Sequence, residues 1–174
     1  MPLPPVPTFH PIAKSDAIVT AKNVRFTVLT DRLIRLEYSK EDHFEDRPSQ
    51  AFWHREQPVP SFKKIITDKT IEIETDYLHL KYQATAKGFT GTTLSIILKQ
   101  TGVIWKYGTR QTENLKGTAR TLDGIGGRTK LENGLLSKSG WATVDDSESL
   151  VFNETGWLEP RHVQTLKVFK TFRV

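Results

Sequence analysis

Apolar and polar residues alternate near the start of the chain with the two-residue period of a β-strand. Residues 24–29 and 33–38 both show this alternation, and the polar segment 30–32 between them predicts a β-hairpin. The apolar side chains then share one buried face: Val24, Phe26, Val28, Ile34, Leu36 and Tyr38. The charged side chains between them fall on the other face, which we expect to be solvated: Arg25, Arg35 and Glu37.

The same alternation continues through the middle of the chain. Residues 63–67, 70–75 and 77–83 predict a meander of three strands, in which Glu72, Glu74 and Lys81 fall on the solvated face. Residues 92–98 and 103–107 predict a further hairpin, and residues 142–145 and 149–153 predict a last strand pair. No amphipathic helix is evident. The expected fold class is therefore all-β, an antiparallel β-sandwich.

Composition divides the chain into three parts. Residues 1–16 are a proline-rich lead, residues 17–160 hold the predicted β-sandwich domain, and residues 161–174 are a basic, apolar and atypical C-terminal tail. Within the domain, residues 39–60 are polar and contain Phe52, Trp53 and His54, which predicts a long excursion from the sheets. Long excursions of this kind are often functional.

Charge and residue usage narrow the function classes. The 174 residues include 25 basic and 20 acidic residues, a net charge of +5 without a block of five or six like charges, so we expect no nucleic-acid partner. No window is long and apolar enough to span a membrane, and the N-terminus lacks a signal-peptide core, so we expect a cytoplasmic protein without a membrane partner. Cysteine is absent and the five histidines lack metal-ligand spacing, so we expect no metal and no cofactor.

The glycine-rich run at residues 117–147 is the main candidate for chemistry. Its six glycines predict a long ordered loop built to present a surface. Carboxylates and an indole, at Asp123, Asp145, Asp146 and Trp141, suit contact with a sugar, because hydroxyls need acceptors and C–H faces stack on indole. The other interpretation is that Asp123-Gly124 and Asn133-Gly134 are hairpin turns, that Trp141 anchors the core, and that Asp145 and Asp146 have structural roles.

Three segments together resemble a known enzyme family. These are VRFTVLTDRLIRLEYS, WKYGTRQTENLKGTARTLDG and LENGLLSKSGWATVDDS, and over residues 15–160 they resemble the N-terminal region of glycoside hydrolase family 31. The family includes α-glucosidases and α-xylosidases. The resemblance implies a galactose-mutarotase-like N-terminal β-sandwich packed against a catalytic (β/α)8 barrel in the same chain.

The resemblance also implies which roles this chain lacks. The catalytic carboxylates of the family lie on the barrel, which needs on the order of 250 residues, and the chain has no matching pattern of strands and helices. We therefore expect no catalytic residue here and a fragment that is inactive alone. A loop of the N-terminal domain commonly helps to shape the sugar subsites, and Arg120, Thr121 and Asp123 are in the matching loop. They are the candidate contacts to an α-glucoside or α-xyloside, with Trp141 as a candidate stacking residue.

A second function class remains open. The chain could be a free-standing carbohydrate-binding or protein-interaction β-sandwich module, with Trp53, Trp105 or Trp141 as a stacking platform for a glucan. Saccharide-dependent tryptophan fluorescence would distinguish this module from an inert domain.

Overall fold

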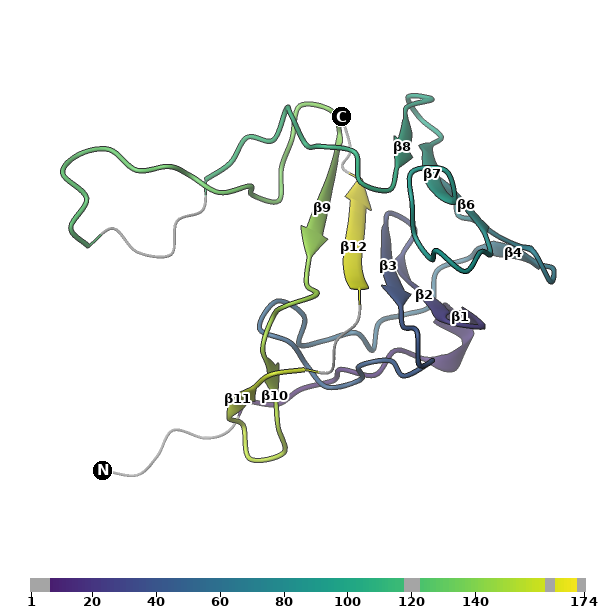
Figure 1. Cartoon of the computed structure of the whole chain (residues 1–174), viewed down its shortest axis with the longest axis horizontal. Coiled ribbons are helices and arrows are strands. Elements are labelled where there is room, and N and C mark those ends of the chain that lie inside the picture. The colour runs from purple at the N-terminus through teal and green to yellow at the C-terminus, as the bar shows by residue number, and fades with distance from the viewer. Residues whose placement is uncertain (1–6, 118–122, 162–164, 172–174) are drawn as a thin grey trace.

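The structure is a computed structural model that describes residues 7–117, 123–161 and 165–171. Two antiparallel five-stranded sheets make up most of it (Figure 1). In spatial order, the first sheet consists of β1 (Ile18–Ala21), β2 (Val24–Thr30), β3 (Leu33–Tyr38), β12 (Thr165–Thr171) and β9 (Trp141–Asp145). The second consists of β4 (Lys63–Ile66), β5 (Thr70–Glu74), β6 (Leu78–Gln83), β7 (Leu94–Leu98) and β8 (Ile104–Lys106). The hairpin of β10 (Val151–Phe152) and β11 (Leu158–Glu159) forms a separate two-stranded sheet. The 3₁₀ turn η1 (Ser15–Ala17) precedes β1.

The two sheets share one apolar core. Phe26 of β2 meets Tyr82 of β6 with ring centroids 5.6 Å apart, and Trp105 of β8 meets Phe169 of β12 at 5.0 Å. The predicted alternation is confirmed on this inner face, since the core includes Val24, Phe26, Val28, Ile34, Leu36, Ile71, Ile73, Leu80, Leu94 and Ile96. All-β architecture with antiparallel sheets is therefore confirmed, and the hairpin β2–β3 and the meander β4–β5–β6 have the predicted order.

The end of the chain differs from the prediction. The sequence interpretation ended the sandwich at residue 160 and left residues 161–174 as a tail, but β12 pairs with both β3 and β9. Phe169 is fully buried between the rings of Trp105 and Trp141. The predicted pairing of residues 142–145 with 149–153 is wrong for the same reason, because β12 takes the place beside β9 and β10 pairs with β11.

The outer face of the first sheet also differs. Its charged residues were expected in solvent, yet Arg25 is only 9% exposed, Arg35 is 2% exposed and Glu37 is fully buried. The residues of the excursion 39–60 lie over this face, and Glu45, Ser49 and Arg55 of that segment are buried with them. Alternation placed these side chains on the correct side of the sheet, but a covering loop changes the environment of that side. In the second sheet Lys81 is exposed and Glu72 and Glu74 are partly exposed, closer to the expectation.

The described residues contain no helix that is long and apolar enough to cross a membrane.

Candidate functional site

A long arm, described over residues 114–117 and 123–137, projects from the sandwich on the β9 side (Figure 1). At its base, the side chain of Asn114 joins the two backbone segments of the arm. The Asn114 Oδ1 accepts hydrogen bonds from the Lys116 and Gly134 amides, both at 2.8 Å, while its Nδ2 donates to the Gly134 carbonyl and to Gln111 Oε1, both at 2.9 Å. Asn114 therefore holds the outgoing and returning segments of the arm together.

Backbone contacts and one glycine complete the base. The Leu115 amide donates to Leu136 O at 2.9 Å, and the Lys138 amide donates to Glu113 O at 3.0 Å. Gly134 admits no side chain, since a Cβ built there would lie 2.5 Å from Lys116 O. The Asn-Gly pair was predicted as a hairpin turn, whereas Gly134 is needed because backbone from the other side of the arm approaches it closely.

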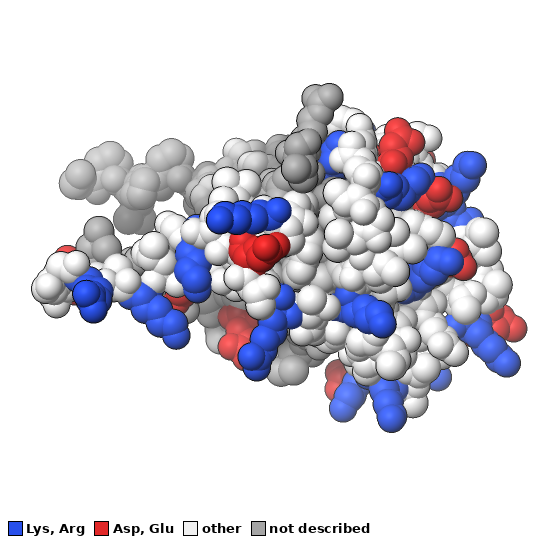
Figure 2. Space-filling model, turned by 90° about the horizontal axis from the view of Figure 1, so that it is seen from above, with Lys and Arg blue, Asp and Glu red and all other residues white. Residues whose placement is uncertain are grey.

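Apolar side chains of the arm are directed to solvent. Four leucines of the arm are at least 39% exposed: Leu115, Leu131, Leu135 and Leu136. Exposed leucines that project from an ordered base are candidates for contact with another protein surface. Figure 2 shows the same molecule from above, with basic side chains spread over the visible face rather than gathered in one patch.

A cleft of about 790 Å³ lies where the arm leaves the sheets. Its wall combines apolar and polar groups, and Gln111 is fixed there by its Nε2 donating to Thr143 O at 2.7 Å. The lining residues are Trp105, Gly108, Thr109, Arg110, Gln111, Thr112, Glu132, Asn133, Gly134, Leu135, Thr143, Val144 and Asp145. Hydroxyl, amide and charged groups line this open hollow together with apolar side chains, so its lining does not select between polar and apolar ligands.

The predicted substrate contacts have different outcomes. Arg120 and Thr121 lie outside the described residues. Asp123 is exposed on the arm, next to Gly124 with φ +70°. Its location on a projecting loop matches the expectation, and its proposed contact with sugar stays a prediction.

Trp141 is a core residue and cannot stack on a sugar. Its side chain is 5% exposed and lies parallel to Phe169, with centroids 6.1 Å apart. Trp105 is 2% exposed and lies against the same ring. The interpretation of Trp141 as a core anchor is confirmed, and the stacking role considered for both tryptophans is wrong, because β12 and the second sheet cover them.

The other two tryptophans reach solvent. Trp53 is 37% exposed but packs edge-on against Phe9 and Phe152, at 5.3 and 5.5 Å. Trp157 is 73% exposed and was not considered in the sequence interpretation. The sequence Asn-Glu-Thr-Gly-Trp predicts a turn, and the turn was the only available signal that this indole leaves the core.

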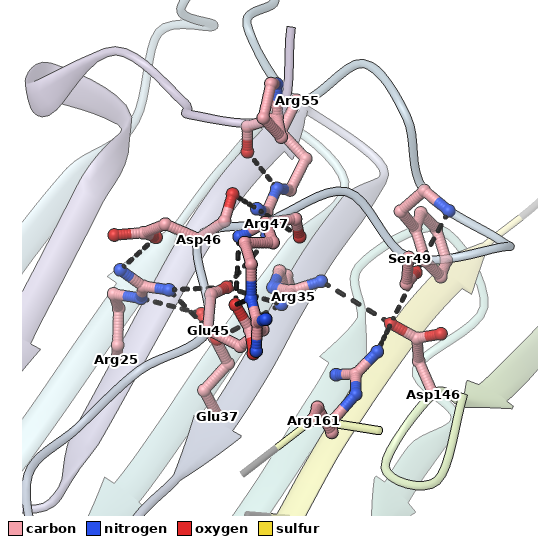
Figure 3. A network of polar contacts seen from close by, with 12 residues as sticks. Arg25, Arg35, Glu37, Glu45, Asp46, Arg47, Ser49, Arg55, Asp146 and Arg161 are labelled. Carbon is pink, nitrogen blue, oxygen red and sulfur yellow. Dashed lines mark hydrogen bonds and ion pairs between the residues drawn. The ribbon is translucent and has the colours of Figure 1, made fainter. Parts of the chain in front are cut away.

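The buried charges of the first sheet form a network (Figure 3). Glu37 accepts hydrogen bonds from Arg25 Nε at 2.8 Å, from Arg25 Nη2 at 3.0 Å and from Arg35 Nη2 at 3.2 Å. Arg25 also pairs with Asp46 at 2.7 Å. Burial alone raises the pKa of Glu37, but Arg35 and Arg25 outweigh it and the pKa ends below the ordinary value.

Asp146 is the second centre of this network. Its fully buried carboxylate accepts from Ser49 Oγ at 2.9 Å and from Arg161 Nη2 at 3.2 Å, and Arg35 Nη1 lies 3.8 Å away. Asp145 instead accepts from the Ser147 amide at 3.2 Å and from its hydroxyl at 2.6 Å. The structural roles expected for both aspartates are confirmed.

Arg55 links the excursion 39–60 to the segment before β1 through hydrogen bonds to backbone carbonyls. It donates to the carbonyls of Pro11, Glu45, Asp46 and Arg47, and none of the described carboxylates forms an ion pair with it. Burial first, and then the nearby Arg35, lowers the pKa of Arg55 to about 9. The guanidinium therefore remains charged at neutral pH and holds four carbonyls of two segments in place.

The buried carboxylates of this network lack the features of a general acid. Glu37, Glu45 and Asp146 are covered and paired with guanidinium groups, and the pKa of Glu37 and of Glu45 is lowered, whereas a general acid needs a raised pKa and access to substrate. Among the described residues, no group of three or more His, Asp or Glu side chains has the arrangement to hold a metal ion.

No family model matches the chain, and no curated protein matches it.

Proposed function

We propose that this chain is the N-terminal β-sandwich domain of an α-glucosidase-like glycoside hydrolase of family 31. In that role it is non-catalytic, supports a (β/α)8 barrel and lends the arm to the binding of an α-glucoside or α-xyloside. The enzyme would hydrolyse O-glycosyl bonds in carbohydrate metabolism, with its catalytic carboxylates on the barrel.

The arm is the observation that carries this proposal. Asn114 makes four hydrogen bonds at its base, so the arm leaves the sandwich in a defined direction. Four leucines along it are exposed, although the sheets behind it have a complete core. A loop that is ordered at its base and exposes leucines among charged residues is suited to packing against a neighbouring domain.

Catalysis by the described residues themselves is disfavoured by geometry. A retaining glycosidase needs two carboxyl groups about 5 Å apart across one sugar ring. The most buried carboxylates, Glu37 and Asp146, are covered by the excursion and neutralised by arginines. The arm can therefore contribute contacts to a sugar, but the acid and the nucleophile would come from elsewhere.

The size of the native gene product tests the proposal. An antibody raised against this chain should detect a protein longer by on the order of 250 residues, the size of the barrel. The immunopurified product should hydrolyse p-nitrophenyl α-glucoside or α-xyloside, and the 19.8-kDa chain alone should not. A native product of 19.8 kDa would overturn the proposal.

Substitution in that product tests the role of the arm. Asp123→Asn should lower kcat/KM by about tenfold, through a loss of about 1.4 kcal/mol of transition-state binding. Asp68→Asn, in the exposed turn between β4 and β5, is the matched control and should leave kcat/KM unchanged. Equal values for the two variants would remove Asp123 from the sugar site.

Carbohydrate binding by the chain itself is the second candidate function. A specific observation favours it, because one tryptophan, Trp157, presents most of its indole to solvent.

A further inference from the structure

The Trp157 side chain is highly exposed, although the turn that carries it is held by hydrogen bonds. It is 73% exposed, the highest value among the exposed large apolar residues of the described chain. The residue lies at the tip of the β10–β11 hairpin, away from the arm (Figure 1). An isolated exposed apolar residue needs no explanation by itself; what distinguishes Trp157 is the way its hairpin is built.

The turn of the hairpin is held by one side chain. Asn153 Oδ1 accepts from the Thr155 amide at 3.0 Å, from the Thr155 hydroxyl at 2.8 Å and from the Trp157 amide at 3.0 Å. The Asn153 amide in turn donates to Trp157 O at 2.8 Å. Gly156 takes the left-handed conformation that the turn requires, with φ +82°. The backbone under the indole is therefore defined before any ligand arrives.

The hairpin is also anchored to the sandwich. Val151 is fully buried, and the Phe152 ring lies 4.8 Å from Phe9 and 5.5 Å from Trp53. The Phe152 amide donates to Pro48 O at 2.8 Å, and the Gln50 amide donates to Leu150 O at 3.1 Å. Because the support is rigid, less conformational entropy of the protein is lost when a ligand binds than at a flexible site.

Polar groups border the indole on its own side of the hairpin. The register pairs Val151 with Glu159 and Phe152 with Leu158, so Trp157 lies across from Asn153, and Glu159 shares its side. Asn153 Nδ2 donates to Glu159 Oε2 at 3.4 Å, and Arg47 pairs with the other oxygen of Glu159. The side chain of Glu159 is 40% exposed and that of Arg47 is 34% exposed, so both reach solvent.

These surroundings distinguish between classes of ligand. Leu158, the exposed apolar residue that follows it, falls on the opposite side of the ribbon, so these two side chains do not form one apolar patch. The core of a protein interface is depleted in charged residues, unlike this border. A pyranose ring instead combines an apolar C–H face with hydroxyls, which an indole bordered by carboxylate, amide and guanidinium groups can satisfy together.

We propose that the β10–β11 hairpin binds one pyranose ring of a carbohydrate chain, with Trp157 beneath its C–H face and Glu159, Arg47 and Asn153 at its hydroxyls. The inference rests on the second candidate function, carbohydrate binding by this chain itself, and is independent of the glycosidase proposal and of the arm.

The indole N–H resonances of the purified chain test the proposal. The chain has four tryptophans and thus four such signals in a ¹H–¹⁵N spectrum. Maltoheptaose, cellohexaose and xylohexaose are titrated separately, and Trp157→Phe identifies its signal. At least one saccharide should shift the Trp157 signal saturably and leave those of the buried Trp105 and Trp141 in place.

Matched variants make the result specific. Trp157→Ala should weaken binding by tenfold or more, while Trp53→Phe, at the other partly exposed tryptophan, should leave it unchanged; Glu159→Gln should weaken it less than the loss of the ring. Thermal unfolding within 2 °C or so of the wild type shows that Trp157→Ala folds, as expected for so exposed a residue.

Three results would overturn the proposal. The first is no saturable shift with any of the three saccharides at 20 mM or so, and the second is binding that survives Trp157→Ala. The third is a Trp157 signal that moves with protein concentration and not with saccharide, which identifies a protein interface. The size of the native gene product affects none of these results, so failure here is distinguishable from failure of the glycosidase proposal.

Discussion

Replacement of Glu37 by glutamine removes one charge from the buried network and keeps the shape of the side chain. Glu37 is fully buried and accepts three hydrogen bonds from Arg25 and Arg35. The neutral amide would leave these guanidinium groups covered without their shared anion. We expect Glu37→Gln to lower the free energy of unfolding substantially, because an uncompensated buried charge is costly.

The structure sets the magnitude. Removal of one partner from a buried ion pair costs roughly 3–5 kcal/mol. Arg25 keeps Asp46 at 2.7 Å and Arg35 keeps the Glu45 carbonyl at 3.4 Å, so we expect the lower end, about 3 kcal/mol. For a domain of this size, that loss corresponds to a fall in Tm of about 10 °C.

The effect should also depend on pH. The pKa of Glu37 is lowered in the folded protein, so its carboxylate contributes stability that is fully present above the unfolded pKa of about 4.3. That contribution is lost as the pH falls through the lower folded pKa. The difference between wild type and Glu37→Gln should therefore be constant near neutral pH and shrink in acid.

Equilibrium urea unfolding of both proteins between pH 7 and pH 3 measures this difference. Glu72→Gln is the matched control, since Glu72 pairs with His79 and Lys81 on a partly exposed strand face and should change stability by at most about 1 kcal/mol. If Glu37→Gln costs no more than the control, or costs the same at pH 3 as at pH 7, the buried network does not stabilise the fold as argued.

Three further substitutions test other parts of the structure. Gly134→Ala places a Cβ 2.5 Å from Lys116 O, so limited proteolysis should cleave the arm faster, while the Tm of the sandwich falls by only a few degrees; unchanged cleavage contradicts the close approach. Gly88→Ala should cost roughly 1–3 kcal/mol in urea unfolding, because residue 88 has φ +65° and the new Cβ would lie 2.6 Å from the Tyr38 ring; a neutral substitution contradicts that contact. Trp141→Ala should cost about 3–5 kcal/mol as a core truncation, and a stable variant with altered saccharide binding would restore its stacking role.

Local pattern was sufficient for most strands because each depends on neighbouring residues. The hairpin β2–β3 followed from alternating residues around the polar segment 30–32, and the meander β4–β5–β6 followed from β-branched residues between turns. The core position of Trp141 was among the interpretations considered, although a tryptophan beside glycines fits a sugar site equally well by residue type alone. Its burial required Phe169, which is distant in the sequence.

The sequence by itself determined the all-β class, the inner apolar face of each sheet and the side on which each charged residue lies, because these follow from a period of two residues. Only the tertiary structure decided that the outer face of β2 and β3 is covered, that β12 lies between β3 and β9, and that Trp157 is presented on a fixed turn. The covering of β2 and β3 arises from contacts between segments far apart in the chain, such as Ser49 with Asp146 and Arg47 with Glu159, whereas the turn before Trp157 is held locally by Asn153. Alternation carries no information about which distant segment covers a face, so burial of a charge or exposure of an indole is set only when the chain has folded.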